Sequence, residues 1–338
     1  MRDKDGAEVW VVAVRGTFMI GPNGATEPAE EQGEVCMAPK YREEPNNSSL
    51  LYDTDLPHKK LATDVLIHGH AYPPEGQPVT KIDVTLKVAN INKTLRVMGD
   101  RVWEDSMFGV SLSKPRPFTK MPITYERAFG GRDETSDNPK DHGWDPRNPV
   151  GTGFATRHQH LVGKLAPNIE DPAAPLDGLR RARPASFGPI PGHWPPRVEF
   201  CGTYDAKWEE ERLPLLPDDF DERFYQCAPP DQQVPSFLRG GELVELHNLS
   251  PRGLLRFRVP RVTLRFGTNF GSGDVRAHRG DLHTVILEPD IPRVILVWHT
   301  HLACHAKVLK LLSTRITVLP RVNVSEEDRA SGMWMGGR

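Results

Sequence analysis

Cysteine is scarce in this sequence, and its spacing argues against two kinds of site. The 338 residues include four cysteines that stand alone: Cys36, Cys201, Cys227 and Cys304. A zinc site needs closely paired ligands and a disulfide scaffold needs dense cysteines, so we predict neither. Isolated thiols are typical of a reducing compartment, and we therefore expect a cytoplasmic protein.

Long apolar runs are also missing. A membrane helix needs about 20 consecutive apolar residues, and no segment approaches that length. The first apolar stretch, residues 9–14, follows three acidic residues and ends at Arg15, whereas a secretory signal has a basic start and an apolar run of about 7–15 residues. We expect no membrane partner and no export signal.

The charges nearly cancel. Lys and Arg total 43 against 45 Asp and Glu, which leaves a formal charge of −2. Non-specific nucleic-acid binding depends on a broad positive field that neutralises phosphates. We therefore expect no nucleic-acid partner.

Proline and glycine, in contrast, are abundant, with 32 and 29 residues where average usage is about 5% and 7%. Much of the backbone must then be turns and fixed loops. The length permits one large domain, which we place at residues 1–324 with a frayed tail at 325–338. The alternative is two β sub-domains, 1–135 and 197–324, joined by the proline-rich segment 136–196.

Strand patterns dominate both halves of the chain. Residues 9–20 are β-branched and apolar, and residues 82–88 alternate apolar with polar side chains, the period of a strand with one buried face. Further strands are predicted at residues 64–72, 94–103, 197–201, 243–247, 253–259, 261–266, 281–287, 293–298 and 307–318. One helix is predicted at 205–212, ended by Pro214. The fold class is all-β, an antiparallel sandwich or a partly open barrel, with one or two short helices and a long ordered proline-rich loop.

That loop, residues 139–196, holds eleven prolines without periodicity, yet it also contains Trp144, Phe187 and Trp194. Disordered linkers are poor in aromatic residues, and long loops inside a compact domain are functional or fixed on its body. We predict that this segment is clamped onto the sheets. Gly130 and Gly131 precede it and indicate a close backbone approach or a positive φ, or a simple turn.

Two histidine pairs are candidates for a metal site. His68 with His70, and His299 with His301, have the spacing that puts two imidazoles on one side of a strand, a pattern that can ligate zinc or iron. No carboxylate accompanies either pair at matching spacing. We predict no metal and no cofactor.

An acidic cluster is the candidate for catalysis. Asp218, Asp219 and Asp221 suit the acid and base pair of a glycoside hydrolase, but aspartates after a proline are equally typical of a helix cap or an Asx turn. The sequence has no Gly-x-Ser-x-Gly elbow, phosphate loop or dinucleotide fingerprint. We expect a non-catalytic protein. The alternatives are a hydrolase acting on carbohydrate or peptidoglycan through this cluster, and a structural subunit.

Residues 202–233 combine aromatic side chains, prolines and carboxylates in irregular backbone. Rigid loops with aromatic anchors suit a protein interface, and a partner strand can also add to an exposed sheet edge. The candidate protein-binding residues are Trp208, Asp219, Phe220, Asp231, Gln232 and Gln233. The same residues can instead pin a long loop to the core, and the sequence leaves both interpretations open.

Several short segments, in order along the chain, carry a family resemblance. They include Ile67-His68-Gly69, Gly99-Asp100-Arg101, Ala128-Phe129-Gly130-Gly131, Asn148-Pro149-Val150-Gly151, Phe187-Gly188-Pro189-Ile190, Gly202-Thr203-Tyr204-Asp205 and Pro230-Asp231-Gln232-Gln233. Over residues 9–320 the chain resembles a bacterial family catalogued as domain of unknown function 2169. The resemblance implies an adaptor or chaperone that loads a toxic effector onto the type VI secretion spike, with the effector and a spike or spike-tip protein as partners.

Overall fold

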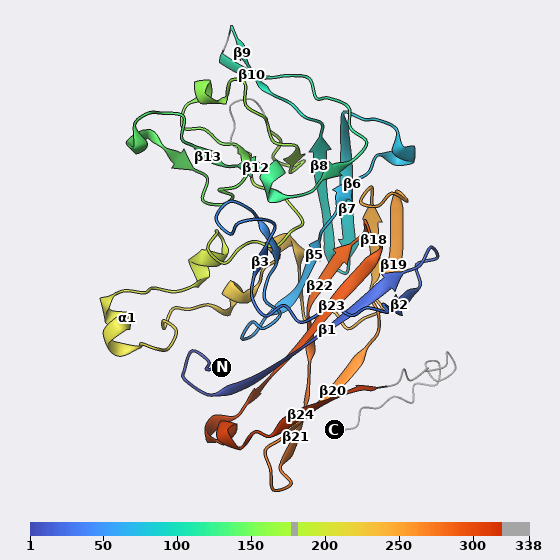
Figure 1. The fold of residues 1–338 in the computed structure, drawn as a ribbon, viewed down its shortest axis with the longest axis vertical. Helices are drawn as coiled ribbons and strands as arrows, with labels where there is room; N and C mark the ends of the chain where they lie inside the picture. Colours follow the sequence, from blue (N-terminus) through green and yellow to red (C-terminus); the bar gives the residue numbers. More distant parts are fainter. Residues whose placement is uncertain (108, 177–181, 320–338) are drawn as a thin grey trace.

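The computed structural model describes residues 1–107, 109–176 and 182–319. Two large sheets form the middle of the molecule, short strand pairs and loops lie at one end, and a three-stranded sheet lies at the other (Figure 1). The predicted frayed tail, 325–338, falls outside the described residues.

The larger sheet has six strands, and all neighbours are antiparallel except β5 and β22, which run parallel. Strand β1 pairs with β23 along nearly its whole length, with Val9 opposite Ala303. This sheet therefore pairs a strand from the first 20 residues with a strand that begins at residue 293. In spatial order its strands are β17 (Gln233–Pro235), β5 (Ala62–Ile67), β22 (Asp281–Glu288), β23 (Arg293–Ala303), β1 (Val9–Ile20) and β2 (Thr26–Pro28).

The second sheet has five antiparallel strands, in the order β16 (Ile169–Glu170), β8 (Ile91–Met98), β7 (Lys81–Val88), β18 (Leu243–His247) and β19 (Leu254–Arg258). The main core includes residues of both large sheets, such as Leu86 and Leu246 of this one and Val285 and Leu296 of the other. Strand β7 has the alternation expected from its sequence, since Val84, Leu86 and Val88 are buried and its lysines are exposed. Both large sheets mix strands from residues 1–135 with strands that follow residue 197.

Strands β5, β22 and β23 are buried on both faces. Their far face packs in a second cluster, in which Leu66, Ile286 and Ile295 meet Cys227 and Ala228. This double burial explains why these strands have continuous apolar runs rather than alternation.

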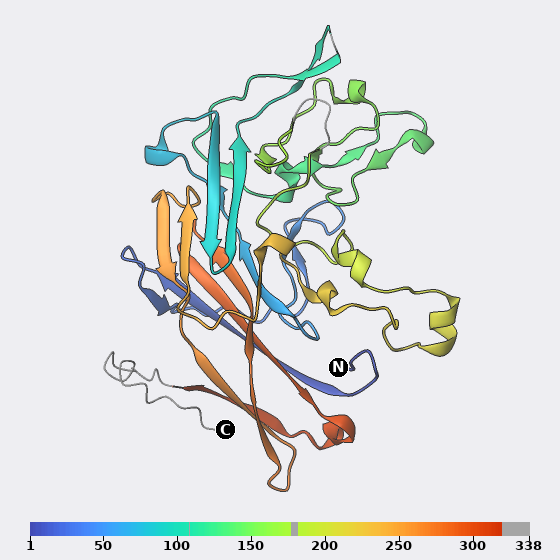
Figure 2. The same cartoon turned by 180° about the vertical axis from the view of Figure 1, so that it is seen from behind.

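The third sheet has the order β21 (Val275–Arg279), β20 (Thr263–Asn269) and β24 (Ser313–Leu319). Its strands extend beyond the two large sheets (Figures 1 and 2). The remaining strands form pairs: β3 (Lys40–Tyr41) with β4 (Leu50–Tyr52), β6 (His70–Ala71) with β11 (Met121–Pro122), β9 (Trp103–Ser106) with β10 (Gly109–Leu112), β12 (Phe129–Gly130) with β15 (Thr152–Gly153), and β13 (Arg132–Asp133) with β14 (Gly143–Trp144).

Helices are few and short. The helix predicted at 205–212 is confirmed as α1 (Ala206–Glu211), and the side chain of its N-cap residue, Asp205, accepts a hydrogen bond from the Trp208 N–H. The 3-10 helices are η1 (Pro74–Gly76), η2 (Tyr125–Arg127), η3 (Pro139–Asp141), η4 (His158–Leu161), η5 (Arg197–Phe200), η6 (Glu222–Tyr225), η7 (Pro230–Gln232) and η8 (His305–Lys310).

The all-β prediction is confirmed, and none of the sheets in the described residues closes into a barrel. The strands predicted at 281–287 and 293–298 are confirmed as β22 and β23, which pair antiparallel. The strand predicted at 197–201 is wrong, because that segment is η5. There Arg197 turns inward, donates to the carbonyls of Ile190 and Phe224, and pairs with Asp53 at 2.9 Å.

Three other predicted strands are shorter than expected. The strand predicted at 64–72 ends at Ile67, and His70–Ala71 forms β6 in a different sheet. The strand predicted at 94–103 stops at Met98, and the next residues contact another segment: the Arg116 N–H donates to the Asp100 carbonyl, and Gly99 lies so close to the Arg116 carbonyl that no side chain would fit there. The first part of the strand predicted at 307–318 is η8, and β24 starts at Ser313.

The proline-rich segment is ordered and clamped to the body over its described part, which excludes residues 177–181. Phe187, Ile190 and Trp194 are buried, and the Ile190 N–H donates to the Cys227 carbonyl at 2.7 Å. The described part of this segment is therefore held against the body of the protein.

Gly130 and Gly131 make a close backbone contact with the proline-rich segment. Their φ values are 146° and 105°, and a Cβ at Gly130 would lie 2.2 Å from the Asn148 carbonyl oxygen. Both the positive φ and the close approach predicted here are confirmed. The Asn148 amide donates to the carbonyls of Tyr125 and Phe129, at 2.8 and 3.0 Å, which holds η2 in place.

Candidate functional site

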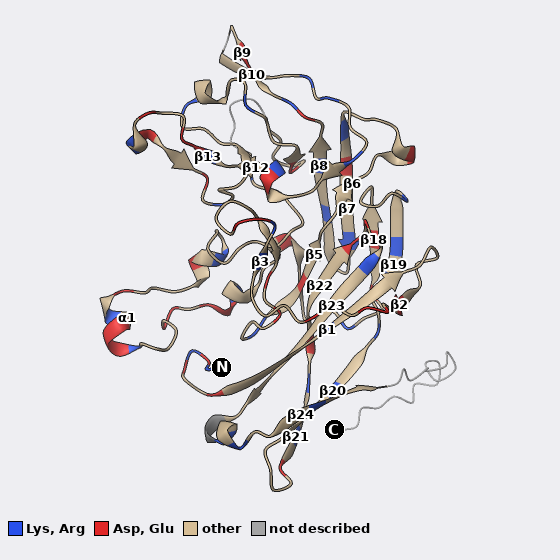
Figure 3. Ribbon diagram, viewed as in Figure 1, with Lys and Arg blue, Asp and Glu red and all other residues tan. Residues whose placement is uncertain are grey.

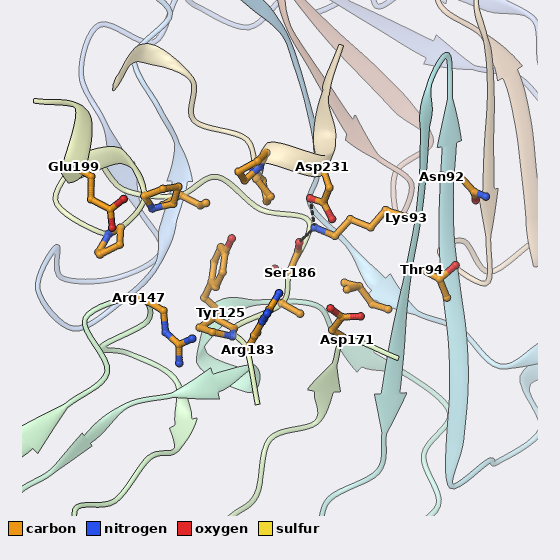
Figure 4. A pocket seen from close by; sticks show the side chains of 18 residues that line it. Asn92, Lys93, Thr94, Tyr125, Arg147, Asp171, Arg183, Ser186, Glu199 and Asp231 are labelled. Atoms are coloured by element: carbon orange, nitrogen blue, oxygen red, sulfur yellow. Dashed lines mark hydrogen bonds and ion pairs between the residues drawn. The ribbon is translucent and has the colours of Figure 1, made fainter. Parts of the chain in front are cut away.

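A cavity of about 620 Å³ opens between the β7–β8 hairpin, the proline-rich segment and the loop before β17 (Figure 4). Tyr125 lies within it, 5% exposed, with its ring edge-on to Trp194 at 5.7 Å. Five prolines line the cavity: Pro184, Pro195, Pro196, Pro229 and Pro230. Since proline fixes φ, these parts of the wall are stiff.

Lys93 ties three parts of the wall together. Its ammonium donates to the Ser186 carbonyl and to Asp231, both at 2.9 Å (Figure 4), and to the Gln232 side-chain oxygen at 2.7 Å. These bonds use all three of its donors. Burial lowers the pKa of Lys93, while Asp231 opposes that shift. The lysine therefore has a positioning role in the cavity wall.

The remaining charges in the cavity are of both signs. Arg147 and Arg183 line it together with Asp171, Glu199 and Asp231. Arg183 is exposed and makes no ion pair with a described residue. A concave surface with mixed charge, apolar walls and little flexibility suits a polypeptide partner, which offers both signs of charge and apolar side chains.

A second cavity of about 430 Å³ lies next to the first along the same segment. His193 and Trp194 line it, and the next two residues, both prolines, line the first cavity. Trp144 borders it with 60% of its surface exposed. In the sequence, Trp144 indicated only that the proline-rich segment is ordered. An exposed tryptophan beside a cavity is instead the residue type that most often anchors a partner.

The predicted binding residues at the end of the 202–233 segment have different surroundings. Gln232 is fully buried, and its amide donates to the carbonyls of Val65 and Phe187, at 2.7 and 3.1 Å. Gln233 donates to the Ala228 carbonyl and begins β17. Of these three residues, only Asp231 lines the cavity, and 61% of its side chain is exposed.

The other predicted residues hold the segment in shape. Asp219 accepts hydrogen bonds from the backbone N–H and the hydroxyl of Thr203. Phe220 is buried against Phe224 and Tyr225. Trp208 lies on α1, edge-on to Tyr204 at 4.7 Å, and donates from its indole to the Leu215 carbonyl. These contacts favour the pinning interpretation, while a binding role for these residues stays a prediction.

Gln232→Leu tests the pinning role. The change leaves the carbonyls of Val65 and Phe187 and one Lys93 donor without their partner, so we expect the free energy of unfolding to fall by about 1–3 kcal/mol. Chemical denaturation measures it. Gln159→Leu, at an exposed position, is the control and should stay within about 0.5 kcal/mol of the unchanged chain. Equal values for the two variants would contradict the pinning role.

The acidic cluster has separate partners. Asp218 pairs with Arg212 at 3.1 Å, and Asp221 pairs with Arg223 at 2.6 Å and caps η6. Hydrogen bonds from Thr203 lower the pKa of Asp219, and the Arg223 side chain lowers that of Asp221. Neither Asp219 nor Asp221 has the raised pKa that a general acid needs.

The two histidine pairs separate in the fold. His299 is buried and stacks on His283 at 4.5 Å between ring centroids, whereas His301 is exposed. His68 is buried beside Tyr52, and His70 pairs with Asp290 at 2.5 Å. The described residues contain no group of three His, Cys, Asp or Glu placed to hold a metal ion.

A buried ion pair fastens the 202–233 segment to β5. Lys60 lies 2.5 Å from Asp64, and both side chains are at most 3% exposed. Asp64 also accepts from the Gln226 amide and the Cys227 N–H, both at 2.8 Å. Burial lowers the pKa of Lys60, but the charge and hydrogen bond of Asp64 outweigh it and the net shift is upward. Burial raises the pKa of the Cys227 thiol, so the thiol stays protonated.

Comparison with known proteins rests on one family model, described as an uncharacterized protein conserved in bacteria (DUF2169), which matches residues 5–299. The chain belongs to the DUF2169 family. That match spans the cavity and both large sheets. No curated protein and no solved structure matches the DUF2169 chain. Among its described helices, none has the length and apolar character that crossing a membrane requires.

Proposed function

We propose that this DUF2169 protein is a cytoplasmic, non-catalytic adaptor that binds a toxic effector and helps to load it onto the type VI secretion spike. The observation that carries the proposal is the stiff cavity with walls of mixed charge beside the exposed Trp144. A preformed surface of this kind loses little conformational entropy on binding. The four cysteines are free thiols, which fits a reducing compartment.

The main alternative is a hydrolase that uses the acidic cluster. Its carboxylates form ion pairs with Arg212 and Arg223 and accept a hydrogen bond from Thr203. None of these carboxylates lines either of the two cavities. These contacts favour binding over hydrolysis. Turnover of a peptidoglycan fragment that disappears in Asp219→Asn would reverse this preference.

Trp144→Ala combined with Arg183→Glu tests the adaptor function. Both side chains border a cavity and are exposed, so we expect unchanged thermal stability and at least a tenfold loss of affinity for the effector, equivalent to about 1.4 kcal/mol. The measurement is co-purification with toxins encoded beside the gene, followed by calorimetry.

Asp105→Ala, an exposed change on β9, is the control and should bind normally. Failure of every neighbouring toxin and spike protein to bind the unchanged chain would overturn the proposed function. Normal binding by the double variant would instead move the interface away from the cavities.

A further inference from the structure

The outer face of the β20–β21–β24 sheet carries three arginines without partners. Arg265 of β20 lies directly opposite Arg279 of β21, and Arg315 of β24 lies diagonally from Arg265, two residues before its partner Thr317. All three are exposed, and none makes an ion pair with a described residue. Figure 3 shows the charged residues of this sheet in blue and red.

Like charges directly opposite each other destabilise a sheet, so this arrangement is unfavourable for the chain alone. Arg276, on the other face of β21, pairs with Asp274 at 3.5 Å. Small residues separate the outer arginines, since Gly267 is opposite both Ala277 and Arg315. The guanidinium groups are therefore accessible from outside.

The inner face is fixed to the body, which leaves the outer face pointing away. His278 bonds to Thr268 and to Thr300 of β23, each at 2.8 Å. Thr314 bonds to Thr268 and accepts from the Trp10 indole, again at 2.8 Å. This network joins all three strands to β1 and β23.

Strand β24 also has a free edge, since among the described residues it pairs with β20 alone. An edge strand presents unpaired N–H and C=O groups that can bind another strand. Ile316 and Val318 stand at this edge, 42% and 67% exposed. They are on the face opposite Arg315, because side chains alternate along a strand.

We propose that the β24 edge and the arginine face bind an extended acidic segment of a partner protein. Its backbone would add a fourth strand to β24. Its acidic side chains would face Arg265, Arg279 and Arg315, and its alternate, apolar side chains would cover Ile316 and Val318. The chain's formal charge of −2 and the apolar edge favour such a peptide over a nucleic acid, which needs a broad positive surface.

The probe is a fluorescein-labelled peptide of ten residues with alternating glutamate and valine, measured by fluorescence anisotropy with the full chain. We expect saturable binding that weakens at high ionic strength. The triple variant R265Q/R279Q/R315Q should weaken binding at least tenfold, and V318K should weaken it through the edge. A peptide with lysine in place of glutamate should not bind.

The matched control removes three exposed cations outside this sheet, in the variant K114Q/R116Q/K140Q, and should bind within twofold of the unchanged chain. Equal loss in both triple variants, or binding of single-stranded DNA but not of the peptide, would overturn the proposal. So would peptide binding that appears only after Glu326, Glu327 and Asp328 become amides, because the chain's own carboxyl-terminal segment would then be the occupant. Effector binding at the cavities is scored separately and does not depend on these outcomes.

Discussion

Asp64→Ala is expected to lower the free energy of unfolding by about 3–5 kcal/mol, the usual result of leaving a buried charge without its partner. The change leaves the Lys60 ammonium without its paired anion, and its remaining hydrogen-bond partners among the described residues are Thr284 and Cys227. It also removes the acceptor of the Gln226 amide and the Cys227 N–H. Denaturant titration measures the loss, and limited proteolysis should show cleavage in residues 202–233.

A surface ion pair supplies the matched control. Arg96 makes two hydrogen bonds to Asp83, at 2.8 and 3.0 Å, with both side chains at least a third exposed. Asp83→Ala should cost no more than about 1 kcal/mol. The double variant K60M/D64A should recover at least 1 kcal/mol relative to D64A alone, because the unpaired ammonium is gone. Equal costs for D64A and D83A would show that the buried pair does not fasten the segment.

Acidification from pH 7 to pH 5 is expected to lower the free energy of unfolding by about 2 kcal/mol for each of three buried histidines. Burial, followed by nearby positive groups, lowers the pKa of His68 to about 3, that of His283 to about 2 and that of His299 to about 3. In the unfolded chain each ring binds a proton below about pH 6.5. The folded state cannot do so until near pH 3, so stability falls steadily as the pH drops through that window.

Denaturant titrations at several pH values between 7 and 5 give this slope. His283→Phe should remove about 2 kcal/mol of the pH dependence, and the new ring can stack on Phe237, as His283 does at 5.4 Å. Val244→Ala is the control, because it weakens the core at a fully buried site without changing a titratable group. It should keep the full pH dependence. If the free energy of unfolding of the unchanged chain did not change between pH 7 and pH 5, the three histidines would not be buried in their neutral form.

Local patterns were enough to predict much of the fold. The alternation in β7 depends on neighbouring residues, so its side-chain period is visible in the sequence. The parallel pairing of β5 with β22 has no local signature, since Asp64 and its partner Thr284 are far apart in the chain. The strand predicted at 197–201 was wrong, because the conformation of this segment follows from the burial of Arg197 rather than from periodicity.

The candidate site was predicted less completely, for the same reason. Residues 202–233 were predicted to have irregular backbone, and the structure gives them only the short helices α1, η6 and η7 before β17 begins at Gln233. Which of its polar side chains point inward depends on distant partners, however, as with Gln232 and the carbonyl of Val65, 167 residues away. Lys93 was not a candidate, because nothing near it in sequence indicates that it would meet Asp231.

The pairing of β1 with β23 sets a condition on biosynthesis. Val9 cannot find Ala303 until all the residues between them have left the ribosome, and at about 5–20 residues per second that takes tens of seconds. During translation the apolar Val9–Ile20 segment can pair only with the short strand β2, at residues 18–20, so most of its length is a target for aggregation or for a general chaperone. Ribosome-bound chains arrested before residue 293 should therefore lack the six-stranded sheet, however long they are allowed to equilibrate.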